Sequence, residues 1–313
     1  MRSPTFLLLL VVCLGGSLTR CAQRDLVTEG KKKLEAQAYT EAEELFSSEL
    51  RGDPRDHEAY WGRAKARMEQ LRYEEAIPDL DQAIQLIGES TPDTGRTLQG
   101  QYHFDRGLSH YALAHFPEAI TDFQRCIDLK YQEAQAHAHL GVAQGNQGKP
   151  VEAVLSLNTA IAQTPDDHFA RANRGYYNSL LGDNKTAIAD FTAAIGLEPD
   201  DKTSYLNRGY TYIGMNDYAA AIQDFEKALE IDPEYQGAIT YLGIALTNSG
   251  NPQAGATWLD RAIKKEPQNG TLFYYRGVAR INSGDIPGGC ADLQQAQSLG
   301  DSQGQSMQES YCQ

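Results

Sequence analysis

Six glycines recur along this chain at an interval of 34 residues, and this spacing restricts the possible folds more than any other feature. They are Gly107, Gly141, Gly175, Gly209, Gly243 and Gly277. The same interval separates the bulky residues Phe123, Leu157, Phe191, Phe225 and Leu259 and the prolines Pro165, Pro199, Pro233 and Pro267. Such a period indicates that one supersecondary unit is stacked repeatedly on copies of itself.

Each unit is expected to contain two antiparallel helices that pack closely where the glycine lies, with the bulky residue filling the space toward the next unit. Glycines suited to the left-handed end of the first helix are Gly148, Gly182, Gly250 and Gly284. Candidate caps of the second helix are Asp183, Asp217 and Asp285. The recurring proline lies at the end of the second helix, which it cannot continue. The pattern therefore predicts an all-α fold.

The unit resembles the tetratricopeptide repeat (TPR). Residues 202–235 show the motif as Tyr205-x2-Arg208-Gly209-x2-Tyr212, followed by Ala221-x3-Phe225 and Pro233. The resemblance implies a right-handed α-solenoid of eight helix pairs. The register places the repeats at residues 23–56, 57–90, 100–133, 134–167, 168–201, 202–235, 236–269 and 270–303.

Two segments depart from the period. Residues 91–99 are an insertion between repeats 2 and 3, and because they contain Pro92 and Gly95, we expect a longer loop there. Residues 301–313 carry Met307 and Tyr311 four positions apart, as on one helix face. An open solenoid end exposes apolar surface, so this segment is expected to form a capping helix.

An arginine of the first helix and an aspartate of the second helix recur together. Both are present in five repeats and both are absent from repeats 1, 4 and 7. The five pairs are Arg63 and Asp79, Arg106 and Asp122, Arg174 and Asp190, Arg208 and Asp224, and Arg276 and Asp292. Because an unpaired, partly buried charge is costly, joint presence predicts an ion pair within each repeat. The rival interpretation, a row of arginines that binds acidic ligands, does not explain the aspartates.

The family resemblance implies that the first helices line a concave groove. The apolar side chains expected there are Trp61, Phe104, Leu108, Tyr111, Phe169, Tyr176, Tyr210 and Tyr274. Aromatic side chains of this kind are suited to binding a peptide. Alternatively, several of them pack against the neighbouring repeat, in which case about half of the set remains accessible to solvent.

No catalytic motif is present: the chain lacks a phosphate-binding loop, a nucleophile elbow and paired Cys-x2-Cys ligands. His103 and His110 could share a helix face, but packing is a better interpretation than metal binding. We therefore expect no catalytic, cofactor or metal site. The net charge of -14 disfavours nucleic acid and anionic lipid as partners and favours a protein or peptide.

Residues 1–22 resemble an export signal, since Arg2 precedes an apolar run that is too short to span a membrane. The sequence Leu18-Thr19-Arg20-Cys21 resembles the lipobox of bacterial lipoproteins, in which the cysteine is acylated. Arg20 stands where that family has a small residue. The alternative is ordinary signal cleavage near Ser17 or Thr19, with Cys21 incidental.

Cys290 lies early in the last second helix, and Cys312 lies at the end of the expected capping helix. If these helices are antiparallel, the two cysteines meet, and an exported protein can retain the disulfide. The alternative is two free thiols near a frayed end.

With its signal and repeats the chain resembles the exported tetratricopeptide lipoproteins of bacteria. This resemblance implies an adaptor of the bacterial cell envelope that binds a protein segment in its groove. It would lie in the periplasm or be held at the outer membrane by a lipid anchor. Two alternatives stay open, a soluble periplasmic chaperone and a non-catalytic regulatory subunit of a cell-envelope enzyme.

Overall fold

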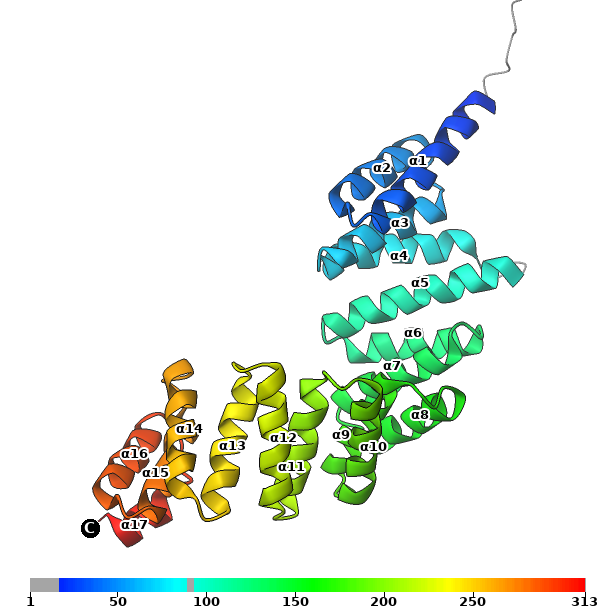
Figure 1. Cartoon of the computed structure of the whole chain (residues 1–313). Coiled ribbons are helices and arrows are strands. Elements are labelled where there is room, and N and C mark those ends of the chain that lie inside the picture. The colour runs from blue at the N-terminus through cyan, green and yellow to red at the C-terminus, as the bar shows by residue number, and fades with distance from the viewer. Residues whose placement is uncertain (1–16, 89–92, 313) are drawn as a thin grey trace, which may run out of the picture. The chain divides into compact units, whose positions relative to one another are not determined.

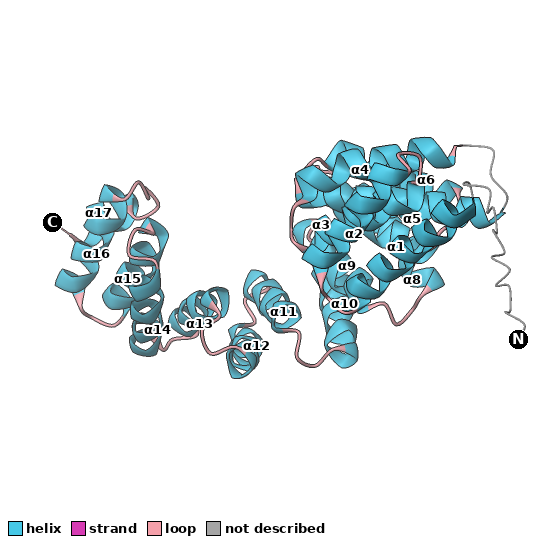
Figure 2. Cartoon of the chain, turned by 90° about the horizontal axis from the view of Figure 1, so that it is seen from above, coloured by secondary structure: helices cyan, strands magenta, loops and turns pink. Residues whose placement is uncertain are grey.

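The computed structural model describes residues 17–88 and 93–312, and throughout these two ranges the regular structure is α-helical (Figure 2). Seventeen helices follow one another along the chain in this described part (Figure 1). They fall into two compact units, unit 1 (Met1–Gly148) and unit 2 (Lys149–Gln313), and each is described separately. The predicted all-α repeat fold is confirmed.

Unit 1 is a stack in which each helix packs against the next. Its helices are α1 (Ser17–Glu35), α2 (Tyr39–Gly52), α3 (His57–Glu69), α4 (Tyr73–Ile87), α5 (Asp93–Ala112), α6 (Phe116–Asp128) and α7 (Glu133–Asn146). The odd-numbered helices are the first helices of repeats 1 to 4. Two of these neighbours, α1 and α3, also contact each other directly.

Unit 2 begins with the second helix of repeat 4 and continues the same alternation. Its helices are α8 (Pro150–Gln163), α9 (His168–Leu180), α10 (Asn184–Leu197), α11 (Lys202–Gly214), α12 (Tyr218–Ile231), α13 (Gln236–Asn248), α14 (Pro252–Lys265), α15 (Gly270–Asn282), α16 (Ile286–Ser298) and α17 (Gln305–Tyr311). The first helices α9, α11, α13 and α15 contact one another in sequence. They therefore form a continuous face of unit 2.

The periodic residues occupy the positions that close packing requires. A Cβ atom placed on Gly209 would lie 2.6 Å from Cε1 of Phe225, and one on Gly107 would lie 2.9 Å from Cε1 of Phe123. Both phenylalanines are fully buried. Because those distances are below normal van der Waals contact, any side chain at either glycine would force the two helices of its repeat apart.

The turns within the repeats follow the expected chemistry. Gly148, Gly182, Gly250 and Gly284 all have positive φ angles, between 83° and 92°. The side chains that accept a backbone N–H at the start of the next helix include Asp183, Asp217 and Asp285. Both devices satisfy backbone groups that the helix ends leave free.

Three boundaries differ from the sequence-based prediction. The insertion at 91–99 is not a loop, because α5 already begins at Asp93. Residues 93–99 contain one glycine and no proline, so nothing in them stops the helix. Residues 91 and 92 lie outside the described residues. Helix α1 begins at Ser17, before the expected start of repeat 1 at residue 23.

The C-terminal helix is shorter than the predicted segment 301–313. It has no buried residue, and Tyr311 is exposed, so the expected apolar capping face is wrong at that residue. The segment instead approaches α16 through Gly304, where a Cβ would lie 2.7 Å from Leu293 Cδ2. No helix in the described part of the chain is long and apolar enough to cross a membrane.

Candidate functional site

The eight residues predicted to line a groove separate into two groups by exposure. Phe169, Tyr176 and Tyr210 are exposed, at 39%, 42% and 50% of their full accessible surface. The other five are half-buried: Trp61, Phe104, Leu108, Tyr111 and Tyr274. The exposed three all belong to α9 and α11, in repeats 5 and 6.

The half-buried residues of unit 1 are held by specific contacts. Nε1 of Trp61 donates a hydrogen bond of 2.7 Å to the buried carboxylate of Asp105 in the next repeat. The ring of Phe104 lies edge-on to three rings, those of Phe123, Tyr131 and His139, at 5.3 to 6.2 Å between centroids. Asp105 and His139 each belong to the neighbouring repeat, and these two contacts match the alternative interpretation, in which the side chains pack against that repeat.

Leu108 and Tyr111 are also engaged within unit 1. Leu108 packs against the apolar clusters of repeats 2 and 3. The hydroxyl of Tyr111 accepts a hydrogen bond of 2.8 Å from Nδ2 of Asn146. Burial raises the pKa of the Tyr111 phenol, although that hydrogen bond opposes the shift. Both side chains therefore help to hold the stack together.

Several large apolar side chains on and next to α9 and α11 are exposed to solvent. Phe169, Tyr176 and Leu180 are separated by seven and four residues, which places them on one face of α9. The exposed large apolar residues of the next first helix are Tyr210 on α11 and Met215, its C-terminal cap residue. We call these five residues the α9–α11 strip.

The sequence-based prediction missed two members of the strip, Leu180 and Met215, which are 59% and 50% exposed. A signal for Leu180 was available, because it lies one helical turn after Tyr176. Met215 has no such signal, since it lies beyond the last residue of the helix. The strip thus extends to the turns that follow α9 and α11.

The tyrosines of the strip have well-defined positions. The ring of Tyr210 meets that of Tyr241 on α13 edge-on, with centroids 5.2 Å apart. Tyr176 meets its sequence neighbour Tyr177 in the same way, also at 5.2 Å. Tyr177 is buried, whereas both strip tyrosines keep about half of their surface accessible. Each of the two rings contacts one neighbouring ring and keeps much of its surface exposed.

The five predicted arginine and aspartate pairs all form in the structure. Each arginine donates two hydrogen bonds to one buried carboxylate, at distances between 2.5 and 2.9 Å. In repeat 3, burial acts to raise the pKa of Asp122, but hydrogen bonds from His103 and Arg106 outweigh it, and the pKa is lowered. The arginines are therefore committed to structural bonds, and the rival interpretation as ligand contacts is not needed.

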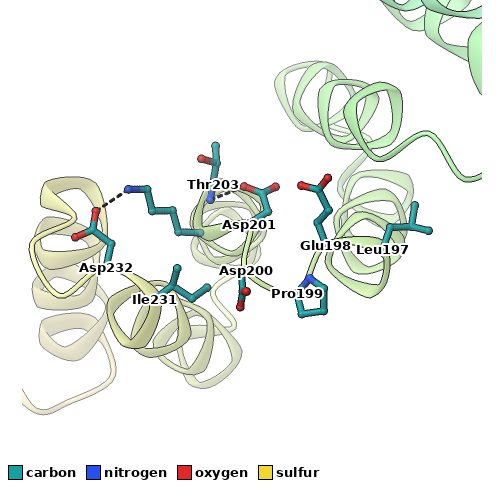
Figure 3. A pocket seen from close by; sticks show the side chains of 9 residues that line it. Leu197, Glu198, Pro199, Asp200, Asp201, Thr203, Ile231 and Asp232 are labelled. Atoms are coloured by element: carbon teal, nitrogen blue, oxygen red, sulfur yellow. Dashed lines mark hydrogen bonds and ion pairs between the residues drawn. The ribbon is translucent and has the colours of Figure 1, made fainter. Parts of the chain in front are cut away.

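A pocket of about 810 Å³ opens between repeats 5 and 6, near the N-terminal end of α11 (Figure 3). Glu198, Asp201 and Thr203 point to one side of it in that view, and Asp200 points to the other. Asp201 Oδ2 lies 2.9 Å from Nε2 of His168, which belongs to α9. Burial acts to raise the pKa of Asp201, but hydrogen bonds from Ser204 and His168 lower it, so the carboxylate is charged at neutral pH.

The cysteines divide into a bonded pair and a buried thiol. Cys290 on α16 and Cys312 after α17 form a disulfide. Cys126 is buried, and burial raises the pKa of its thiol, so it is a core residue. The side chain of Cys21 lies outside the described residues. Among the side chains that are described, no three His, Cys, Asp or Glu residues are arranged to hold a metal ion.

Comparison with known families gives matches to models described as tetratricopeptide repeat. The matched ranges are residues 27–93, 104–168, 170–201 and 203–235. Together they cover more than half of the chain. Repeats 7 and 8 lie beyond these ranges, and there the structure shows the same helical pairs. No protein of curated function is detectably similar in sequence.

Solved structures with a similar fold include the following three. A tetratricopeptide repeat protein from Parabacteroides merdae ATCC 43184 has a TM-score of 0.58 and 15% identity, with 92% of this chain and 97% of that chain covered. MamA from Desulfovibrio magneticus RS-1 has a TM-score of 0.51 and 19% identity, with 55% of this chain and 97% of that chain covered. YrrB, described as having an unusual peptide-binding site, has a TM-score of 0.48 and 21% identity, with 62% of this chain and 95% of that chain covered. At these identities the likeness shows the fold alone.

Proposed function

Because this chain belongs to the tetratricopeptide repeat family, we propose that it is a non-catalytic scaffold that binds a protein or peptide segment on the α9–α11 strip. The observation that carries the proposal is the exposure of the strip: its five large apolar side chains, on α9, on α11 and at the C-terminal cap of α11, are 39% to 59% exposed. Several large apolar side chains exposed on neighbouring helices of one fold are typical of an interaction site.

The strip is also well suited to binding because ion pairs hold the helices that carry it. The helices that carry it are tied to their partners by the Arg174–Asp190 and Arg208–Asp224 pairs, whose carboxylates are buried. A partner that docks there need not order the surface first, so more of the contact energy remains for affinity. Exposed aromatic side chains in fixed positions are the usual anchors of such interfaces.

The test is site-specific photocrosslinking in the native cell. A photoreactive phenylalanine analogue replaces Tyr210 or Leu180 in the strip, and crosslinked products are identified by mass spectrometry. The matched control places the analogue at Leu155, which is 61% exposed but lies on the second helix α8. We expect the same defined product from both strip positions and none from the control. Equal labelling at all three positions would contradict the proposal.

We further propose that the scaffold acts in the bacterial cell envelope, either soluble in the periplasm or anchored at the outer membrane through an acylated Cys21. The apolar run before Cys21 supports export, and a disulfide between Cys290 and Cys312 is compatible with an oxidising compartment. Fractionation of cells after labelling with radioactive fatty acid tests this. Label that disappears in a Cys21→Ser variant supports the anchor, an unlabelled periplasmic protein supports the soluble form, and a cytoplasmic protein overturns both.

A further inference from the structure

Resting on the proposed function, we infer the chemistry of the partner: a segment with large apolar side chains in its centre and lysine or arginine on both flanks. The inference follows from the charges around the α9–α11 strip. Repeats 5 and 6, residues 168–235, contain eleven Asp and Glu residues but only six Lys and Arg residues. The apolar strip therefore lies on a surface of net negative charge.

The cations of these two repeats are almost all neutralised by carboxylates of the same repeats. Arg174, Arg208, Lys202 and Lys227 form ion pairs at 2.5 to 2.7 Å, and Arg171 lies 4.0 Å from Asp190. Within repeats 5 and 6, which the structure describes in full, this leaves Lys185 as the one Lys or Arg without an ion pair. An acidic partner would thus find little to bind there.

Glu198, the C-terminal cap residue of α10, lies near one end of the strip. Its side chain is 63% exposed and lies 3.4 Å from Nδ1 of His168, with no Lys or Arg in contact. In Figure 3 it points to the same side as Thr203, which precedes Tyr210 by two helical turns on α11. Glu198 and the neighbouring Asp201 are therefore placed beside the end of the strip where α9 and α11 begin.

The other end of the strip is bordered by Asp183 and Asp217, which are exposed and cap the helices that follow. Hydrogen bonding to Thr186 lowers the pKa of Asp183, so it is charged at neutral pH. The C-terminal ends of α9 and α11, which are the negative ends of the helix dipoles, lie at the same end and favour cations as well. Negative potential thus brackets the apolar strip on both sides.

The length of the strip fixes the spacing of the partner's charges. Phe169 and Leu180 are eleven residues apart on α9, which corresponds to about 17 Å at the rise of an α-helix. An extended segment covers this distance with about five residues. We therefore expect two basic residues separated by about five positions in an extended ligand, with aromatic or aliphatic residues between them.

The experiment is a selection from a random twelve-residue peptide library displayed on phage, with the full chain as bait. The bait variants are Tyr176→Ala with Tyr210→Ala, and the charge variant Glu198→Gln, Asp183→Asn and Asp217→Asn. Asparagine caps a helix as well as aspartate does, so the charge variant keeps its helix starts. The matched control, Glu118→Gln, Glu152→Gln and Glu226→Gln, removes the same charge from exposed positions on second helices.

We expect enriched peptides with the basic, apolar, basic pattern, which lose binding to the tyrosine variant. Their affinity, measured by fluorescence anisotropy at low salt, should fall about tenfold in the charge variant and less than about twofold in the control. Circular dichroism verifies that each bait is folded.

Each other outcome decides a different question. Peptides that depend on Tyr176 and Tyr210 but carry no basic residues would overturn the charge inference and leave the proposed function intact. Basic peptides that weaken equally in the charge variant and the control would show general attraction to an acidic protein, and would also overturn the inference. If no enriched peptide depends on the two tyrosines, both the inference and the proposed function fail.

Discussion

The first-helix faces of the two units use the same 34-residue register but differ in accessibility. In unit 1, Trp61 and Phe104 occupy predicted groove positions and are half-buried by other side chains. In unit 2, Tyr176 and Tyr210 occupy predicted groove positions and are exposed. The register therefore determines which way a side chain faces, and the neighbouring repeat determines whether anything covers it.

The covering groups of unit 1 are individual side chains outside the periodic pattern. Asp105 accepts hydrogen bonds from Trp61 and Lys65, at 2.7 and 3.3 Å. Tyr131 and His139 pack edge-on against Phe104. Around Tyr210, Tyr241 makes one edge contact and leaves half of the surface open. Apolar side chains stay exposed where such covering residues are absent.

The largest expected effect tests the 34-residue register, which both units share. Val in place of Gly107 or Gly209 would drive a Cβ to less than 3 Å from a buried phenylalanine ring. Overpacking of this kind should destabilise each unit by about 3 kcal/mol. Thermal unfolding followed by circular dichroism measures this. A variant that melts like the wild type in one unit only would show that the register is not common to both.

This shared register is also what made much of the fold predictable. The contact of Gly209 with Phe225 and the Arg208–Asp224 ion pair both lie within one repeat. Because their residue types recur every 34 residues, one repeat motif predicts the same contacts in the other repeats. The start of α5 at Asp93 could not be obtained in this way, because the insertion has no counterpart in other repeats. Exposure of the strip depends on contacts between repeats, which the period does not record.

The second prediction tests the difference between the units directly. Phe104→Ala removes a ring that packs against three others, and should destabilise unit 1 by about 2 kcal/mol. Tyr176→Ala removes an exposed ring, and should cost about 0.5 kcal/mol. Chemical denaturation of both variants, with hydrogen exchange to assign the unit that opens, makes the comparison. Equal losses would mean that Tyr176 is a structural residue and not part of a free surface.

A third prediction concerns Glu49, which stands in repeat 1 where Ala194 and Ala228 stand in repeats 5 and 6. Glu49 is 1% exposed, its Oε2 has no hydrogen-bond partner in the described part of the chain, and burial raises its pKa, with Asp56 and Asp53 adding to the shift. A raised pKa means that the folded state binds the proton more tightly than the unfolded state. This contribution to stability is present below the unfolded pKa of about 4.5 and is lost as the pH rises through the folded pKa.

Accordingly, Glu49→Ala should stabilise unit 1 at neutral pH by about 1 kcal/mol, since it removes an unsatisfied buried carboxylate. The gain should shrink as the pH falls toward 4.5. Unfolding curves at several pH values measure it, with Glu44→Ala on the same helix as the control. A variant that is less stable than the wild type at neutral pH would show that Glu49 has a favourable partner.

The units also differ at the left-handed residue that follows the first helix of each repeat. In unit 1 this residue is not glycine in three of the four repeats, with φ of 61° at Leu71 and 58° at Ala114, and it is glycine only at Gly148. In unit 2 it is glycine in three of the four repeats, Gly182 among them, and Asn216 in the other. A side chain in this conformation costs about 1 kcal/mol. Ala114→Gly should therefore stabilise unit 1 by somewhat less than about 1 kcal/mol, because glycine also loses more entropy on folding. Gly182→Ala should destabilise unit 2, and a gain from it would contradict the strain argument.

The smallest expected effect concerns the disulfide. Unit 2 has this bond, and the described part of unit 1 has none. The bond joins Cys290 to Cys312 across α17, which has seven residues and no buried side chain. A crosslink over a loop of this size would contribute about 3 kcal/mol if both ends unfolded together with the core. Because a helix so short is unstable alone, we expect α17 to open separately. Cys312→Ser should then shift the global unfolding of unit 2 by less than about 0.5 kcal/mol and abolish hydrogen-exchange protection in residues 305–311. If the free energy of global unfolding of unit 2 instead fell by about 3 kcal/mol, α17 would unfold together with the rest of the unit.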